Sequence, residues 1–349
     1  MVMDTLQKLL GIDLPLIQAP LAGIQGHAMA IAVSNAGGLG SLPCAMLTPD
    51  ALRKELELIR AGTSKPYNVN FFAHTPPTPD AKREAAWRAA LAPYYREYGI
   101  DPDSIPQGAG RAPFSAEAAE LLSKFKPAVV SFHFGLPEQA LLDRVRSWGA
   151  KVLCSATTVA EARWLEEHGV DAIIAQGIEA GGHRGFFLTH DLSTQVGTFA
   201  LLPQIVRAVR VPVIAAGGIA DAAGVAAAKL LGAAGVQIGT SYMLTPEAFT
   251  SAPHRAALKG FAAEHTALTT LFTGGPARGI FNRVMRELGP LNSAAQVFPL
   301  ATAAIASLRS KAEAQGSGDF SPLWSGQNAR GCKEIPSADL TRELAAGWA

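Results

Sequence analysis

The sequence predicts an α/β protein, namely a (β/α)8 TIM barrel with a smaller, mainly helical lid domain. Short runs rich in Val, Ile and Leu recur at eight places in the first 240 of the 349 residues. Longer stretches with helical spacing of apolar residues separate most of these runs. The runs lack polar alternation, as strands buried on both faces do, and parallel neighbours need helical crossovers. These observations favour a barrel, and a doubly wound open sheet is the alternative.

The predicted strands and helices alternate along the chain. The strands are residues 16–19, 39–42, 67–71, 128–132, 151–155, 172–176, 211–215 and 235–239. The helices between them are residues 27–35, 49–61, 138–148, 159–168, 199–209 and 221–231.

Two segments depart from this repeat and predict the lid. Residues 73–126 open with HTPPTPD and continue through the charged helix DAKREAAWRAALAPYYREYG to the Gly/Pro-rich IPQGAGRAP. The tail after the eighth strand contains predicted helices at 254–264 and 291–314. We therefore assign residues 1–75, 125–250 and 316–349 to the barrel. Residues 76–124 and 251–315 form the predicted lid over one mouth of the barrel.

Composition excludes several classes of function. With 30 Lys and Arg against 29 Asp and Glu, the net charge of +1 gives no basic footprint for nucleic acid or an anionic membrane surface. Cys44, Cys154 and Cys332 fit neither a disulfide framework nor a zinc site, and predict a reducing, cytoplasmic location. Charges at Asp4 and Lys8 interrupt the first apolar stretch, so we expect no signal peptide, and no run predicts a membrane span.

The active site of such a barrel lies at the carboxyl ends of its strands. The residues predicted there are Gln18, Ala19, Pro20, Gly40, Ser41, Asn70, His133, Gln176, Gly217, Gly218, Gly239 and Thr240. Glycines cluster after the seventh and eighth strands, where such barrels hold a phosphate group on backbone amides. A side chain there would keep the backbone away from the phosphate oxygens. The alternative is that AAGGI and QIGT are merely tight turns.

Amide side chains suggest what the phosphate belongs to. Asn70 and Gln176 carry both donors and acceptors, which suit the edge of a planar heterocycle such as the pyrimidine ring of a flavin. A capping Asn and a turn Gln are the structural alternative. Gly181 and Gly182 open the loop after the sixth strand and permit close backbone contact with a ligand. The combination indicates flavin mononucleotide (FMN) rather than a sugar phosphate.

Histidine supplies the candidate chemistry. His133 and His183 fall at strand ends that face the same predicted pocket, where an imidazole removes or delivers a proton, or holds an anion as imidazolium. Packed or backbone-bonded histidines are the alternative, and we expect His168 and His254 to lie on helical surfaces. The sequence has no HExxH, no metal-spaced Cys/His set, no GxSxG and no P-loop, so we predict no metal site.

Seven motifs in order resemble the nitronate monooxygenase family, formerly called 2-nitropropane dioxygenases, and are most similar to its bacterial class I. They are IQAPLAGI, AGGLGSL, NVNFFAH, VVSFHFGLP, AQGIEAGGHRG, VPVIAAGGIAD and GVQIGTSYMLTPEA, within residues 10–290. The resemblance implies non-covalent FMN and oxidation of alkyl nitronates, propionate 3-nitronate among them, by dioxygen. The products would be a carbonyl compound and nitrite, formed through a flavosemiquinone. The implied FMN contacts are Ala19, Pro20, Leu21, Asn70, Gln176, Gly181, Gly182, Gly217, Gly218, Gln237, Ile238, Gly239 and Thr240. The implied substrate-side histidines are His133 and His183, with His183 as catalytic base.

The chain departs from the family pattern on the substrate side. In VFPLATAAIASLRSKA, Phe298 replaces an expected aromatic tyrosine and Ser307 stands where a lysine is expected. Ahead of the fourth strand, Ala109 and Gly110 occupy the place of another tyrosine.

Other functions remain open at this point. One is an NAD(P)H-dependent quinone or enoyl-thioester reductase on the same FMN barrel. A non-flavin enzyme acting on a phosphorylated metabolite and a binding module without catalysis are further alternatives. A homodimer is an expectation that rests on the Ala-rich helices and the apolar tail.

Overall fold

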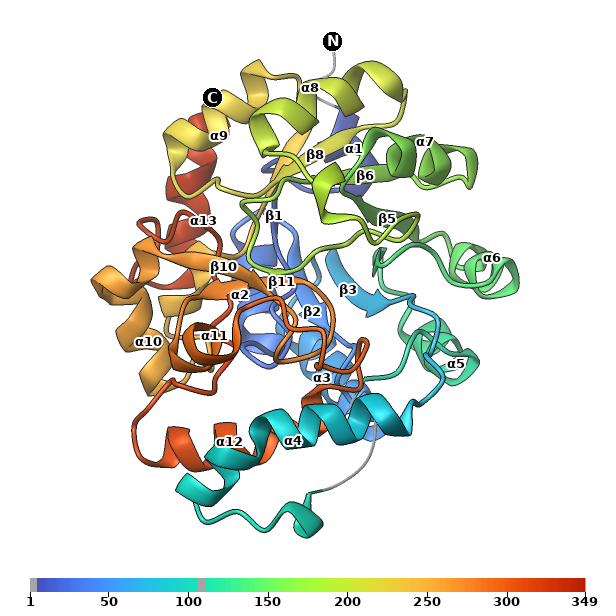
Figure 1. Cartoon of the computed structure of the whole chain (residues 1–349). Coiled ribbons are helices and arrows are strands. Elements are labelled where there is room, and N and C mark those ends of the chain that lie inside the picture. Colours follow the sequence, from blue (N-terminus) through green and yellow to red (C-terminus); the bar gives the residue numbers. More distant parts are fainter. Residues whose placement is uncertain (1–4, 106–110, 349) are drawn as a thin grey trace.

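The computed structural model describes residues 5–105 and 111–348, in which eight parallel strands close into a barrel surrounded by helices (Figure 1). In order around the barrel these are β1 (Leu16–Gln18), β9 (Gly235–Ile238), β8 (Val213–Ala216), β6 (Ala172–Gln176), β5 (Lys151–Ala156), β4 (Val129–His133), β3 (Tyr67–Phe72) and β2 (Gly40–Pro43). A parallel bridge between Ile17 and Leu39 joins β1 to β2. The predicted TIM barrel is confirmed, and the open sheet is wrong.

The ends of the strands agree with the prediction to within two residues, and β6 has the predicted bounds. The largest difference is at β8, which begins at Val213 rather than at residue 211. Pro212 precedes it and has no N–H to donate to a neighbouring strand.

Helices cover the outside of the barrel. In the described part of the chain, those between consecutive strands are α2 (His27–Asn35), α3 (Pro49–Gly62), α5 (Ala116–Phe125), α6 (Gln139–Ser147), α7 (Val159–Glu167), α8 (Thr198–Ala208) and α9 (Ala222–Leu230). The C-terminal α13 (Ser337–Ala345) packs against α2 and α9, and so takes the place of the eighth barrel helix (Figure 1).

Helix α3 illustrates how the sequence sets these elements. Thr48 Oγ1 accepts a hydrogen bond from the Ala51 N–H at 3.3 Å and caps the first turn. Leu52, Leu56 and Ile59 follow at helical spacing and are buried against the sheet. The helix therefore presents one apolar face to the barrel.

The N-terminal mouth of the barrel is closed by α1 (Thr5–Leu10). Leu6 and Leu10 are buried in one cluster with Ile17 and Ile214, which lie on β1 and β8. Because this end is filled, a ligand has room only at the carboxyl ends of the strands.

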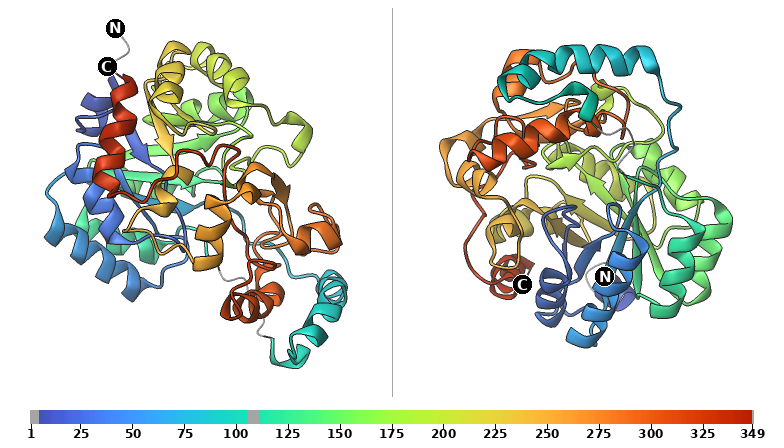
Figure 2. Two further views of the ribbon diagram at one scale, coloured as in Figure 1. Left: turned by 90° about the vertical axis from the view of Figure 1, so that its left-hand side faces the viewer. Right: turned by 90° about the horizontal axis from the view of Figure 1, so that it is seen from below.

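The lid is built from segments far apart in the sequence. Helices α4 (Ala81–Glu97) and α12 (Thr302–Ala314) lie side by side (Figures 1 and 2). Trp87 Nε1 donates to Ala301 O at 3.1 Å, and Tyr95 Oη donates to the Ala304 carbonyl at 2.7 Å.

The lid is less helical than the sequence predicts. Besides α10 (Ala252–Lys259) and α11 (Arg283–Leu288), it contains an antiparallel sheet in which β11 (Ala277–Ile280) pairs with both β10 (Thr266–Thr269) and β7 (Gly182–His183). The predicted helix at 291–314 begins only at Thr302, and Pro299 lies in the non-helical part. The strands are too short to give a periodic signal. The domain boundaries given above stay a prediction.

Candidate functional site

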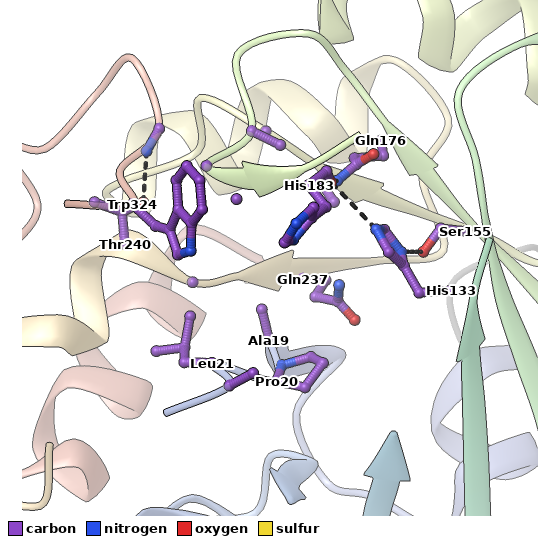
Figure 3. A pocket seen from close by; sticks show the side chains of 18 of the residues that line it. Ala19, Pro20, Leu21, His133, Ser155, Gln176, His183, Gln237, Thr240 and Trp324 are labelled. Atoms are coloured by element: carbon purple, nitrogen blue, oxygen red, sulfur yellow. Dashed lines mark hydrogen bonds between the residues drawn. The ribbon is translucent and has the colours of Figure 1, made fainter. Parts of the chain in front are cut away.

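A cleft opens at the carboxyl ends of the barrel strands, under the lid (Figure 3). It holds about 1350 Å³ of space up to its open mouth. The predicted FMN contacts and the two predicted histidines all lie on its wall, whereas Gln18, Gly40 and Ser41, which were also predicted at the strand ends, do not line it. Those on the wall are Ala19, Pro20, Leu21, Asn70, His133, Gln176, Gly181, Gly182, His183, Gly217, Gly218, Gln237, Ile238, Gly239 and Thr240.

Three glycine amides form one end of the cleft. Gly217 and Gly218 have φ values of +117° and +73°, a backbone conformation that favours glycine. Within residues 5–105 and 111–348, the N–H groups of Gly217, Gly218 and Gly239 donate to no acceptor. Unpaired N–H groups gathered on a concave surface suit an anion such as a phosphate.

The C-terminal tail wraps around these glycine loops. Gly326 N–H donates to Thr240 Oγ1 at 2.9 Å, and Asn328 Nδ2 donates to Gly218 O at 3.3 Å. Both residues line the cleft, and sequence reasoning missed them because they lie far from any strand end.

The glycine loop after β8 is also supported from beneath. Glu179 accepts hydrogen bonds from Thr198 N–H at 2.8 and 2.9 Å. Thr198 Oγ1 lies 2.9 Å from both Glu179 Oε2 and Gly217 O. This bracing holds the backbone amides in place.

Amide acceptors occupy the middle of the cleft. Asn70 Nδ2 donates to Ser131 Oγ at 2.9 Å and to Ser131 O at 3.3 Å, which leaves Asn70 Oδ1 for a ligand. Gln237 Oε1 is buried and has no partner in the described structure. Such an acceptor is costly unless something bonds to it. Acceptors at this depth, together with the glycine amides, fit a flavin with a phosphate.

An apolar wall faces these amides. Ala19, Pro20 and Leu21 form it, across the cleft from His183 and Trp324 (Figure 3). Gln25 Oε1 accepts from Leu21 N–H at 3.0 Å and anchors the wall to the barrel interior. A flat ring therefore has a surface on which to lie.

Gln176 lines the cleft and uses both ends of its side-chain amide within the protein. Its Nε2 donates to His183 O at 2.9 Å, and its Oε1 accepts from Gly185 N–H at 2.8 Å. The side chain therefore braces the loop that carries His183. This tertiary contact cannot be predicted from a single glutamine at the end of a strand.

His133 uses both of its ring nitrogens within the protein. Its Nε2 lies 3.1 Å from His183 O, which only accepts, so Nε2 carries the proton. Its Nδ1 then accepts from Ser155 Oγ at 2.9 Å. Burial lowers the pKa of His133 to about 4, so the ring is neutral at pH 7 and does not hold an anion as imidazolium. A catalytic role for His133 stays a prediction.

His183 keeps one ring nitrogen available. Its Nε2 lies 2.8 Å from Thr273 Oγ1, and Nδ1 has no hydrogen bond to any described residue. Burial, with Arg111 adding to the effect, holds the pKa of His183 well below its usual range. The ring centroid lies 5.1 Å from that of Phe298 and 5.6 Å from that of Trp324. A neutral imidazole in an aromatic cage suits a base.

Arg111 is the charged residue that sequence reasoning missed. It lines the cleft, and its Nη1 donates to Thr302 Oγ1 at 2.8 Å. In the sequence it is a single arginine within the Gly/Pro-rich stretch IPQGAGRAP, which by itself does not indicate a ligand site. Phe72, Ser155 and Trp324 were missed as well.

The other predictions for individual residues have mixed outcomes. Ser307 does not line the cleft, and Ala109 and Gly110 lie outside the described residues. His254 was expected on a surface, but it is buried and its Nε2 lies 3.1 Å from Trp324 O. In the described ranges no cluster of three His, Cys, Asp or Glu forms a metal site, and no helix is long and apolar enough to cross a bilayer.

Comparison with known proteins agrees with the site. The family model described as nitronate monooxygenase matches residues 3–347. A nitronate monooxygenase of Paraburkholderia phytofirmans is 42% identical, with coverage of 97% of this chain and 93% of that protein. One from Pseudomonas aeruginosa is 41% identical, with 98% of each covered.

Solved structures give the same picture. A nitroalkane oxidase from Streptomyces ansochromogenes superposes with a TM-score of 0.88 at 37% identity, covering 98% of this chain and 97% of that one. FabK from Thermotoga maritima has a TM-score of 0.73 at 26% identity, with coverage of 98% and 95%.

Proposed function

The chain belongs to the nitronate monooxygenase family, and from this membership we propose that it oxidises alkyl nitronates with dioxygen to a carbonyl compound and nitrite, using FMN. The family is a group of flavin-dependent oxidoreductases, so the chain is an enzyme of that type acting on a small molecule. The observation that carries the proposal is the single cleft in which unpaired glycine amides, buried amide acceptors and His183 lie together.

The cofactor proposal follows the shape of the cleft. Gly217, Gly218 and Gly239 would hold the phosphate of FMN, while Asn70 and Gln237 would accept from its ring. Bound there, FMN supplies the one-electron chemistry between the nitronate and dioxygen.

The protein's own part concerns a proton and an anion. His183 Nδ1 would accept the proton from the carbon next to the nitro group when the neutral nitroalkane is the substrate. The imidazolium that results would stay beside the new nitronate and stabilise it. Gln176, His133 and Thr273 hold His183 in place through its backbone carbonyl and its Nε2. With a preformed nitronate, no base is required.

The test has two parts. The purified protein should release FMN on denaturation, identified by mass. In air it should consume oxygen and form nitrite from propionate 3-nitronate. In His183→Asn, bound FMN should persist and turnover of a neutral nitroalkane should fall by about 10²- to 10⁴-fold, the range typical of a general base. The same substitution at the exposed His190 is the control. Absence of flavin, or no nitrite from any nitronate, would contradict the proposal.

A reductase is the second candidate. The same fold occurs in an enoyl reductase domain from Bacillus amyloliquefaciens, at 16% identity and a TM-score of 0.53, which shows the fold alone. A reductase would oxidise NAD(P)H with a quinone or an enoyl thioester and leave nitronates untouched. Steady-state assays with both sets of substrates therefore separate the two functions.

A further inference from the structure

We propose that Arg111 determines substrate specificity by binding a second anionic group, a carboxylate at the end of the substrate remote from the nitronate. This inference rests on the proposed nitronate oxidation and adds a residue and a selectivity to it.

Arg111 reaches the cleft from the segment between α4 and α5. Its side chain is half-buried. It makes one hydrogen bond to the described residues, in which Nη1 donates to Thr302 Oγ1 on α12 at 2.8 Å. A guanidinium carries five N–H donors, so most of its capacity is free.

Two other enclosed arginines of this chain, Arg184 and Arg283, have more partners than Arg111. Arg184 donates to Gln195 Oε1 at 3.0 Å and to two carbonyls at 2.7 Å. Arg283 forms ion pairs with Glu97 at 2.6 Å and Glu287 at 2.9 Å. Arg111, by contrast, has one hydrogen bond to the described residues, and no acidic side chain among them lies in ion-pair distance of it. A partly desolvated cation without a counter-ion is unfavourable unless a ligand supplies the anion.

The remaining wall of the cleft carries no fixed charge. Among the described residues that line it, Arg111 is the only Lys, Arg, Asp or Glu. The pKa values of His74, His133 and His183 are all lowered by burial, so these rings are neutral at pH 7. An anionic substrate group has Arg111 as its one charged partner on this wall.

The position of Arg111 fits the remote end of a substrate. Its charge lowers the pKa values of His74 and His183, so it lies on the histidine side of the cleft. Arg111 also lines a second, adjoining cavity together with Ala45 and Ala112. It therefore lies where the cleft continues away from the proposed position of the flavin ring. A planar carboxylate matches the guanidinium fork and accepts two parallel hydrogen bonds from it.

The kinetic test uses two nitronates that differ only at the remote end. Propionate 3-nitronate carries a carboxylate where propyl 1-nitronate carries a methyl group. In Arg111→Met, kcat/KM for propionate 3-nitronate should fall by about 10- to 100-fold, as for the loss of a hydrogen bond to a charged group. The loss should appear mainly in KM. The value for propyl 1-nitronate should change much less, and Arg111→Lys should recover part of the loss. Arg88→Met, on α4 and paired with Glu84, is the matched control.

Equal losses on both nitronates, or no loss on either, would overturn the proposal. A binding measurement tests the role of Arg111 even if the protein does not oxidise nitronates. Succinate has the shape and charge of propionate 3-nitronate but is not oxidised, and butyrate lacks its second anionic group. By calorimetry the wild-type protein should bind succinate more tightly than butyrate, and Arg111→Met should abolish the difference. If the wild-type protein shows no preference for succinate, Arg111 does not have this role, whatever the enzyme oxidises.

Discussion

At the scale of single residues, His183 and Arg111 are coupled through charge. Burial is the largest cause of the low pKa of His183, and the positive charge of Arg111 is the next. His133 and His74 add smaller effects in the same direction. The ring of His183 is therefore neutral at pH 7, as the proposed base must be.

This coupling predicts the pH dependence of kcat/KM with nitroethane, a neutral nitroalkane. The acid limb should lie below about pH 6.5, the ordinary value for histidine, because a proton binds buried His183 only at lower pH. Arg111→Met removes a charge that lowers the pKa of His183, so the limb should move to higher pH. Measured between about pH 5 and 8, an unchanged limb in this variant would contradict the assignment of His183 as base. Arg88→Met should leave the limb in place.

The two predicted histidines show where sequence reasoning stops at this scale. His133 and His183 both occupy strand ends or loops at the cleft, as the sequence order implies. The two rings differ in their hydrogen bonds. His133 uses both ring nitrogens within the protein, whereas His183 uses one. Those partners, Ser155 and Thr273, lie 22 and 90 residues away along the chain.

At the scale of elements, the glycine loop after β8 can be tested alone. An ideal Cβ at Gly218 would lie 3.4 Å from Glu179 Cβ, so there is space for it, but φ is +73°. We expect Gly218→Val to remain folded and to lose FMN, because the branched side chain would displace the amides from the phosphate. The measurement is the flavin-to-protein absorbance ratio after gel filtration.

Gly149→Val is the control for backbone strain. Gly149 also has a positive φ, of +86°, and a Cβ there would meet nothing within 4 Å. It precedes β5, away from the cleft. Normal flavin content in Gly218→Val would mean that this glycine does not contribute to a phosphate site.

The contact between α4 and α12 has its own energetic prediction. Leu308 on α12 is fully buried, and it lies in one cluster with Trp87 and Leu91 of α4. Leu308→Ala should lower the free energy of unfolding by about 2–5 kcal/mol, because a cavity remains between the helices. Leu230→Ala is the control, since Leu230 is 88% exposed and its truncation should cost less than about 0.5 kcal/mol. Urea titration measures both. Similar values for the two variants would show that the helix contact adds no stability.

The lid sheet shows what an element-level pattern misses. His183 and Gly182 pair with Ala277 and Arg278 of β11. This pairing joins a barrel loop to the C-terminal tail, and neither partner is part of an alternating run long enough to predict a strand. The loop that carries His183 is therefore fixed by a contact that local sequence does not encode.

At the scale of the whole molecule, the barrel was predictable, and the lid was predictable only in its main helices. The carboxyl ends of parallel strands meet at one mouth, so strand order alone gathered Ala19, Asn70, Gly217 and Gly239 into a single cleft. No comparable rule predicts where the residues of the C-terminal tail lie relative to the cleft. Trp324 reaches the same cleft through packing between distant segments, and only the folded structure reveals it.

The whole molecule should also lose stability in acid for an identifiable reason. Burial lowers the pKa values of both His133 and His254 to about 4. In the unfolded chain these rings take up protons below about pH 6.5, whereas the folded protein keeps them neutral. The unfolded state then binds more protons, so the free energy of unfolding falls as pH decreases, by about 3 kcal/mol per histidine between pH 7 and 4.

His254→Gln isolates one of these contributions. His254 lies on α10 away from the glycine loops, and a glutamine amide can still donate to Trp324 O. Urea unfolding from pH 7 to 4 should show a decline smaller by about 3 kcal/mol than in the wild-type protein, because the unfolded variant has one proton fewer to bind. His190→Gln, at an exposed ring, is the control. If His254→Gln declines as steeply as the wild-type protein, His254 is not held neutral by burial, and the acid sensitivity must arise from other groups, such as the buried His133 and His183.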